Sequence, residues 1–352
     1  MKTLRLVGMA LFAILMCVNF ASCNSDENIP TTEEQEFYTV KLGLGGEIVD
    51  ITEEPLSRAT TDDLYGIQVY SAIDKDLAEG ERDEWKPYAY GLFNDLDKMS
   101  INLLKGYKYK FAASMVVDGI NKILPSGPNS YGYPFSLNKN GTLGSALLDN
   151  KFTPSYSDYF NQLDESSSYL NGQRHQTFKR PNTDRYYGIL DSYKPLKDGE
   201  TAEINMKRVG FGAKFIIEKN ENISGSLAIN IEYAPEISID LLENEITDFD
   251  IYTFYNMKDA YNKDGYTEDV PVCFVWTNDE GAAVSLGTHN ITYTRNKTTV
   301  VTVKITNAGK DSNIGIKIED SEKGDMDEDR NNDVTIEDGE IVNTNVGTEN
   351  EG

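Results

Sequence analysis

The 352-residue sequence contains few of the residues on which most metal and nucleophilic sites depend. The two histidines, His175 and His289, lie far apart, and neither has neighbours at metal-ligand spacing. The sequence also lacks a nucleophile motif, a zinc motif and a glycine-rich phosphate loop that precedes a helix. These absences argue against an enzyme and against a bound cofactor.

Long hydrophobic runs are equally scarce, and the one that is present lies at the N-terminus. "MKTLRLVGMALFAILMCVNFASC" has a basic start, an apolar stretch and a small-residue end, which predict a secretory signal over residues 1–22. The ending "FASC" resembles a bacterial lipobox, although Phe20 stands where leucine is commoner. We therefore predict that Cys23 carries palmitate or another acyl group; a plain signal peptide that ends nearby is the alternative. Since no other stretch could span a bilayer, we expect an outer-membrane lipoprotein at the cell surface, anchored by lipid alone.

Cysteine is too rare for a disulfide framework. Of the three cysteines, Cys17 leaves with the signal and Cys23 takes the lipid, so only Cys273 remains, in "VPVCFVWT". Its apolar surroundings predict a small buried side chain. An exported chain without an intramolecular disulfide has to be stabilised by its hydrophobic cores, which two domains of ordinary size can provide.

Basic residues are outnumbered, with 33 Lys and Arg against 58 Asp and Glu and a formal net charge of −25. Loss of Lys2 and Arg5 with the signal brings the mature chain to about −27. Such a surface repels phosphate backbones and anionic lipid headgroups. Nucleic acid is therefore excluded as a partner.

What the sequence does contain is a series of short strand-like segments. An acidic tether without apolar periodicity is predicted over residues 23–36. Alternating apolar residues then begin at "FYTVKLGLGGEIVDI", and later segments such as "LYGIQVYSA", "GFGAKFIIE", "SLAINIEY" and "TTVVTVKIT" are separated by Gly, Pro, Asn and Asp. We predict an all-β protein with two antiparallel sandwiches in tandem, over residues 37–205 and 206–352, the second ending in an acidic tail.

Residues 125–185 differ in texture from the rest of the first domain. They are rich in Ser, Asn, Gly and Tyr, and carry turn signals such as "PSGPN" and "NKNG". One piece, "SDYFNQLDESSSYL", has weak helical character. We predict a long loop excursion here, with the most variable surface of the protein.

Four stretches in this order resemble the fimbrillin family of Bacteroidales, the type V pilins and related surface lipoproteins. They are "FASC", "YTVKLGLGGEI" followed by "PLSRATTDDLYGIQVY", "NMKRVGFGAKFIIE" and "HNITYTRNKTTVVTVKI". The resemblance implies two Greek-key, transthyretin-like sandwiches and a subunit of a fimbrium or another adhesive surface structure. It also implies like subunits as partners, a host or bacterial surface ligand, and no cofactor.

Assembly in that family implies roles for two segments of this chain. The first strand, about residues 37–51, would be removed when an arginine-specific protease cuts between Arg58 and Ala59. A strand from the next subunit would then fill the vacated groove by β-augmentation. Pro55 and the polar residues around Arg58 suit an exposed, extended loop. The alternative is an ordinary interstrand loop in which Arg58 balances neighbouring acids.

The C-terminal end fits a donated strand poorly. "NNDVTIEDGEIVNTNVGTENEG" alternates apolar residues only briefly before glycines and acids interrupt the pattern. A strand made from it would bury little apolar area. This favours a tip, an anchor or a non-polymerising relative over a stalk subunit, and a monomeric surface domain is a further alternative.

An acidic segment precedes that end. Residues 319–340 contain eleven acids, among which Asp325, Asp327 and Asp329 have the spacing of calcium ligands. However, Arg330 stands where the calcium-loop pattern needs glycine, and Glu337 comes one residue late for the bidentate position. A solvated acidic loop is the simpler interpretation.

Aromatic residues are the last candidate, because 21 tyrosines are many for this length. Several alternate within strands, where packing explains them. The cluster expected to be exposed is Tyr131, Tyr133, Tyr156 and Tyr159, which could stack on sugar rings. It supports the alternative function, a surface glycan-binding lipoprotein of a nutrient-uptake system.

Overall fold

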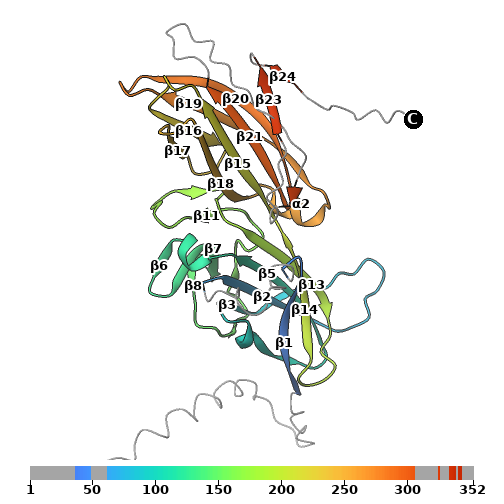
Figure 1. The fold of residues 1–352 in the computed structure, drawn as a ribbon. Helices are drawn as coiled ribbons and strands as arrows, with labels where there is room; N and C mark the ends of the chain where they lie inside the picture. Colours follow the sequence, from blue (N-terminus) through green and yellow to red (C-terminus); the bar gives the residue numbers. More distant parts are fainter. Residues whose placement is uncertain (1–35, 49–61, 306–323, 326–332, 338–339, 343–352) are drawn as a thin grey trace, which may run out of the picture. The chain divides into compact units, whose positions relative to one another are not determined.

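The structure, a computed structural model, describes residues 36–48, 62–305, 324–325, 333–337 and 340–342; side chains are described only up to residue 305. Nearly all of its regular structure is β-strand, arranged in several largely antiparallel sheets that form sandwich-like layers (Figure 1). The predicted all-β class is confirmed. Three short helical segments interrupt the described strands: η2 (Leu96–Lys98), α1 (Gly119–Lys122) and α2 (Met257–Asn262).

An eight-stranded sheet organises the N-terminal part. Its order is β4-β1-β14-β13-β5-β2-β3-β9. The strands are β1 (Phe37–Gly46), β2 (Leu64–Ile73), β3 (Lys86–Phe93), β4 (Ser100–Leu104), β5 (Tyr107–Val116), β9 (Thr153–Pro154), β13 (Arg185–Tyr193) and β14 (Thr201–Arg208). The sheet curls on itself, so that strands near opposite ends of this order meet: the Tyr88 hydroxyl on β3 donates to the Asn102 carbonyl on β4 at 2.7 Å. One strongly curved sheet therefore supplies both layers around a common core.

Strand alternation explains which side chains fill this core. On β5, Tyr109, Phe111 and Ala113 are fully buried, and on β2 the same holds for Ile67 and Val69. Strands β4 and β5 are joined by only two residues, Lys105 and Gly106, yet they do not pair; β4 pairs with β1, and β5 with β2 and β13. The short link therefore crosses from one layer of the curled sheet to the other.

Residues 125–185 form strands and a small core, where the sequence predicted a loop excursion. One sheet contains β6 (Pro125–Gly127), β7 (Ser130–Lys139), β8 (Thr142–Leu147) and β10 (Tyr159–Phe160), and a two-stranded sheet contains β11 (Ser168–Tyr169) and β12 (Thr177–Phe178). Phe135, Leu137, Phe160 and Leu163 pack in a buried cluster.

The predicted helical character within this region is wrong. The fully buried Arg185 guanidinium donates to the backbone carbonyls of Gln162, Leu163 and Glu165. A helix needs those carbonyls for its own i to i+4 hydrogen bonds. A tertiary contact therefore overrides the weak local preference.

Two further sheets form the C-terminal part. One has the order β18-β15-β21-β23-β24, with β22 paired to β21, and the other β17-β16-β19-β20. The strands are β15 (Gly210–Lys219), β16 (Ser226–Ile231), β17 (Ile237–Asp240), β18 (Glu245–Thr253), β19 (Thr267–Thr277), β20 (Ala283–Thr294), β21 (Lys297–Ile305), β22 (Gly324–Asp325), β23 (Asp333–Glu337) and β24 (Glu340–Val342). The chain leaves the first sheet at Arg208 and enters the second set at Gly210.

The core between these sheets follows the predicted alternation on β15, where Phe211, Ala213, Phe215 and Ile217 are all buried. Cys273 differs from the prediction, because it is half-buried rather than buried. Its neighbours Val272, Phe274 and Trp276 take the inward positions of β19, which turns Cys273 to the other face of the sheet.

The strand pairing is not purely antiparallel. Of the described strands, three pairs run parallel: β1 with β14, β15 with β21, and β21 with β23. In both parts the first strand therefore lies parallel to a strand from the end of the same part. Such pairing needs long connections, which short hairpin signals in the sequence do not reveal.

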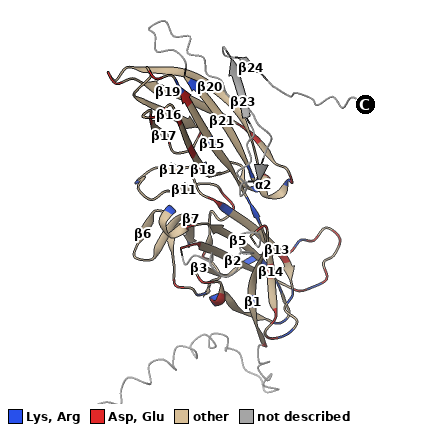
Figure 2. Cartoon of the chain, viewed as in Figure 1, with Lys and Arg blue, Asp and Glu red and all other residues tan. Residues whose placement is uncertain are grey.

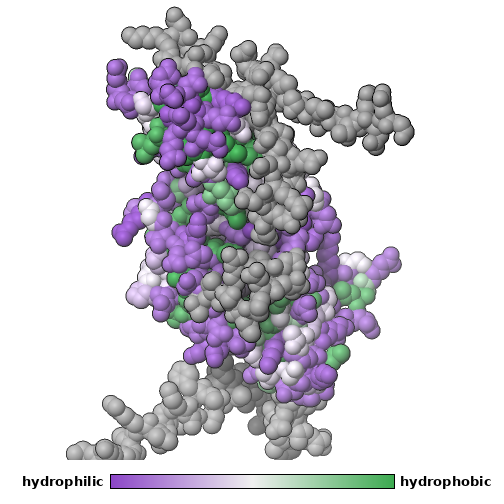
Figure 3. All heavy atoms as spheres, in the orientation of Figure 1, coloured by the Kyte–Doolittle hydropathy of each residue, from purple (hydrophilic) through white to green (hydrophobic). Residues whose placement is uncertain are grey.

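Charge does not gather at one place on the described surface. Acidic and basic residues are spread over both sets of sheets, largely at strand ends and in loops (Figure 2). On the face seen in Figure 3, hydrophobic residues form small separate patches among hydrophilic ones.

Candidate functional site

The first strand, β1, lies inside the eight-stranded sheet. It pairs antiparallel with β4, from Phe37–Leu104 to Lys41–Ser100, and parallel with β14, from Lys41–Thr201 to Gly46–Met206. Two of its side chains, Val40 and Leu42, are 0% and 6% exposed in the core. Without β1, the strands β4 and β14 would each show an unpaired edge, and an apolar groove would open between them.

Further backbone contacts in the middle of β1 add to this ladder. The Leu42 amide donates to the Met99 carbonyl at 2.8 Å, and the Lys41 amide donates to the Glu200 carbonyl at 2.9 Å. At the far end Gly46 has φ +76°, a left-handed conformation, and a Cβ there would stand 2.6 Å from the Met206 carbonyl oxygen. Only glycine permits this close approach of β1 to β14.

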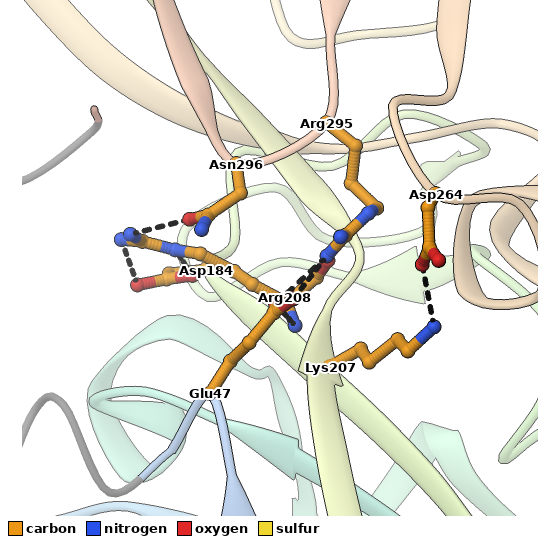
Figure 4. A network of polar contacts seen from close by, with 7 residues as sticks. All are labelled: Glu47, Asp184, Lys207, Arg208, Asp264, Arg295 and Asn296. Carbon is orange, nitrogen blue, oxygen red and sulfur yellow. Dashed lines mark hydrogen bonds and ion pairs between the residues drawn. The ribbon is translucent and has the colours of Figure 1, made fainter. Parts of the chain in front are cut away.

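Glu47, the next residue, anchors the end of the strand. Both of its carboxylate oxygens accept from Arg295 Nη1, at 2.9 and 2.7 Å, and Oε2 also accepts from the Arg208 amide at 2.8 Å (Figure 4). The side chains of Arg295 and Glu47 are 9% and 28% exposed. Because little water reaches the pair, its charges interact more strongly than those of a surface pair.

Arg295 reaches Glu47 from the turn between β20 and β21. Its amide donates to the Tyr266 carbonyl, the following amide of Asn296 donates to the Gly210 carbonyl, and Asn296 has φ +55°. Arg295 Nη1 also donates to the Arg208 carbonyl at 3.0 Å. The first strand is thus tied to a turn of the C-terminal sheets.

Two more ion pairs surround this anchor (Figure 4). Arg208 makes a bidentate contact with Asp184, at 2.8 and 2.7 Å, and its side chain is only 4% exposed. Lys207 contacts Asp264 at 2.9 Å and holds the pKa of that carboxyl below its ordinary value. Contacts from both sets of sheets therefore meet around Glu47.

Most residues of the predicted lipidation, cleavage and calcium sites lie outside the described part of the chain. These are Cys23 for the lipid, Arg58 and Ala59 for the cleavage, and Asp327 and Asp329 for calcium. Asp325 falls in β22, but its side chain is not described. The lipid anchor, the cleaved bond and the calcium site therefore stay predictions. The described chain resumes at residue 62, just before β2.

The four candidate tyrosines do not form the exposed cluster that the sequence predicted. Tyr156 is 84% exposed, but Tyr131 is 5% exposed, because the pleat of β7 turns it into the small core. Tyr133 packs edge-on against Tyr169, and the Tyr159 hydroxyl accepts from Asn138 Nδ2. A cavity of about 410 Å³ is lined by Tyr133 but by none of the other three. Glycan binding by this set stays a prediction.

Within the described residues, no three His, Cys, Asp or Glu side chains are grouped so that they could hold a metal ion. No helix there has the length and apolar character needed to cross a membrane.

Sequence reasoning missed Glu47 and Arg295. The signal for Glu47 was present, since a single acid follows "LGLGG" at the end of an apolar strand. The sequence does not indicate an ion pair for Arg295, because a basic residue in a hairpin turn is ordinarily solvated. The two are 248 positions apart, so only the fold brings them together.

No protein-family model and no curated protein matches this sequence. The solved structures that this chain resembles include proposed adhesins, proposed cell adhesion proteins and a fimbrial anchor protein. A proposed adhesin from Bacteroides ovatus ATCC 8483 is 10% identical at a TM-score of 0.34, with 77% of this chain and 88% of that chain covered.

Two others extend the comparison. The fimbrial anchor protein Mfa2 from Porphyromonas gingivalis is 8% identical at a TM-score of 0.34, covering 80% of this chain and 96% of that one. A proposed cell adhesion protein from Bacteroides ovatus ATCC 8483 is 8% identical at a TM-score of 0.35, with 83% of this chain and 98% of that chain covered. The all-β fold itself follows from the strand pairing described above.

Proposed function

We propose that this chain is an adhesive surface protein of the fimbrillin type, a pilus subunit or related lipoprotein that joins like subunits by strand exchange. The two sets of sheets would be two domains, of which the N-terminal one accepts the strand. The observation that carries the proposal is the position of β1, which is hydrogen-bonded on both sides within its sheet. The chain directly after it contains the Arg58–Ala59 bond.

Assembly would take two steps: cleavage after Arg58, and then displacement of β1 by a donated strand. Burial of side chains such as Val40 and Leu42 contributes about 1.5–3 kcal/mol each, and the backbone ladders and Glu47 add to this. Cutting the chain after Arg58 would therefore leave β1 seated in its groove. A donated strand would have to displace it, using the same backbone hydrogen bonds for affinity and alternate side chains for register.

Limited digestion of the lipid-free mature chain with an arginine-specific protease tests the first step. We expect a new N-terminus at Ala59, with the β1 fragment retained until it is displaced. Arg82 and Arg174 are also exposed, so the Arg58→Gln and Arg82→Gln variants form a matched pair. Only Arg58→Gln should abolish the Ala59 terminus; native Arg58 that resists cleavage would overturn the proposed processing.

Displacement tests the second step. A labelled peptide of residues 37–51 is added in excess to the cut chain, and its incorporation is followed by fluorescence anisotropy. We expect uptake by the cut chain and none by Arg58→Gln. A cut chain that takes up no peptide, and that stays monomeric at high concentration, would exclude assembly by strand exchange.

A further inference from the structure

A second feature, far from β1 in the sequence, is a pair of stacked and half-exposed tyrosines. Tyr233 follows β16, and Tyr255 follows β18; their ring centroids are 5.4 Å apart with 26° between the planes. The rings are 50% and 39% exposed. Lys179 Nζ lies 5.4 and 5.6 Å from the two centroids. A stacked aromatic pair that stays in contact with water is available to a ligand.

The backbone of Tyr233 is held in a conformation that tyrosine avoids, with φ +65°. A bulky residue at positive φ costs free energy and is rare outside special turns. Arg180 maintains it: its amide donates to the Tyr233 carbonyl at 3.0 Å, and its buried guanidinium binds the Glu232 carbonyl and the Glu268 carboxylate. The same residue places its neighbour Lys179 beside the rings.

Tyr255 forms part of the wall of a cavity of about 440 Å³. This volume lies within the range of small-molecule sites, about 300–1,000 Å³. The lining also includes Asp164 and Glu165, and the Ser166 hydroxyl beside them donates to the Tyr255 carbonyl at 3.1 Å.

The segment that contains Asp164 and Glu165 is held in place by hydrogen bonds to its backbone. Arg185 is fully buried and binds three backbone carbonyls of residues 162–165. Two buried arginines thus fix segments that line or border one cavity. Such support behind the contacting groups is what a preorganised binding site needs.

The groups in the cavity indicate the class of ligand. Lys179 and Lys258 repel a cation near the rings, whereas Asp164, Glu165 and Asp259 repel an anion. Asn256 and the serine hydroxyls offer both donors and acceptors. A neutral ligand with one apolar face and many hydroxyl groups satisfies all of these groups, and a pyranose ring has that form, because its axial C–H groups can contact the negative face of an aromatic ring.

We propose that this cavity, with the Tyr233–Tyr255 pair at its side, binds a neutral oligosaccharide. A second cavity of about 280 Å³, lined by Tyr70 and Trp85, shares the wall residue Asp164. The shared residue places the two cavities next to each other. The site is independent of strand exchange, since it contains no part of β1.

The test uses the uncut, lipid-free mature chain on an array of neutral, sialylated, uronic-acid and sulfated oligosaccharides, followed by calorimetry with the tightest neutral binder. Tyr255→Ala should weaken binding at least about tenfold, the loss expected for one stacking ring. Tyr255→Phe keeps the ring and should bind as wild type does. Tyr156→Ala removes a more exposed tyrosine that lies outside the cavity and should have no effect.

A second variant separates loss of the site from loss of the fold. Ser167→Trp fills the cavity from its half-buried wall, so binding should disappear while the thermal unfolding curve stays unchanged. Three outcomes overturn the proposal: no neutral oligosaccharide binds, only charged ones bind, or Tyr255→Ala binds as tightly as wild type. None of them bears on cleavage at Arg58.

Discussion

Replacing Glu47 by Gln measures how firmly the first strand is anchored. Exposed ion pairs contribute about 0–1 kcal/mol, whereas removal of one partner from a fully buried pair costs about 3–5 kcal/mol. Arg295 and Glu47 lie between these limits, at 9% and 28% exposure. Gln can still accept from the Arg208 amide, so we expect Glu47→Gln to lower the free energy of unfolding by about 2 kcal/mol.

Chemical denaturation of Glu47→Gln, Arg295→Met and the double variant gives the coupling energy of the pair. The control cycle uses Lys263 and Asp259, a helical pair at 3.0 Å with side chains 61% and 52% exposed. That pair should couple by about 0.5 kcal/mol or less. A coupling between Glu47 and Arg295 no larger than this would refute the anchoring role.

The same variant has a consequence for strand exchange. If the 2 kcal/mol is lost from the bound state of β1, its dissociation after cleavage at Arg58 accelerates by up to about 30-fold. Peptide uptake by the cut Glu47→Gln chain should then be faster than by the cut wild type. Equal rates would show that Glu47 stabilises the sheets without retaining the strand.

Three further predictions concern the rest of the described chain. Leu42→Ala should cost about 2–5 kcal/mol of unfolding free energy because it empties a core position, while Lys41→Ala on the exposed face of the same strand should change it by less than about 0.5 kcal/mol. Burial lowers the pKa of His289, so the folded state binds the proton less readily than the unfolded chain. The contribution of His289 to the free energy of unfolding is therefore fully present above the unfolded pKa of about 6.5 and is lost as the pH drops below it. Denaturation followed across that pH range should show a smaller loss for His289→Gln than for wild type. Arg185→Met leaves three backbone carbonyls without their donor, two of them in buried hydrogen bonds, and should cost at least about 3 kcal/mol, against no measurable change for Arg174→Met in an exposed loop.

Periodicity predicted the strands of this protein well, because alternation records which face of a strand is buried. Val40 and Leu42 on β1 follow it, and so do Phe211, Ala213, Phe215 and Ile217 on β15. Cys273 did not, since apolar residues on both sides hid the alternation of β19. In residues 157–170 a weak helical pattern was overridden by Arg185, a residue beyond the segment itself.

The candidate sites were less predictable than the strands. A tyrosine count cannot tell Tyr131, which the pleat buries, from Tyr156, which stays exposed. The stacked pair of Tyr233 and Tyr255 gave no signal at all, because stacking joins residues that no local pattern relates.

The sequence by itself determined the all-β class, the acidic charge and the short-range alternation, since each depends on residues that are neighbours in the chain. Only the tertiary structure decided that β1 lies between β4 and β14, that Glu47 meets Arg295, and that two buried arginines support the Tyr255 cavity. These contacts join positions far apart in sequence. They form when the sheets close on their cores, and that closure selects the partners of each polar group.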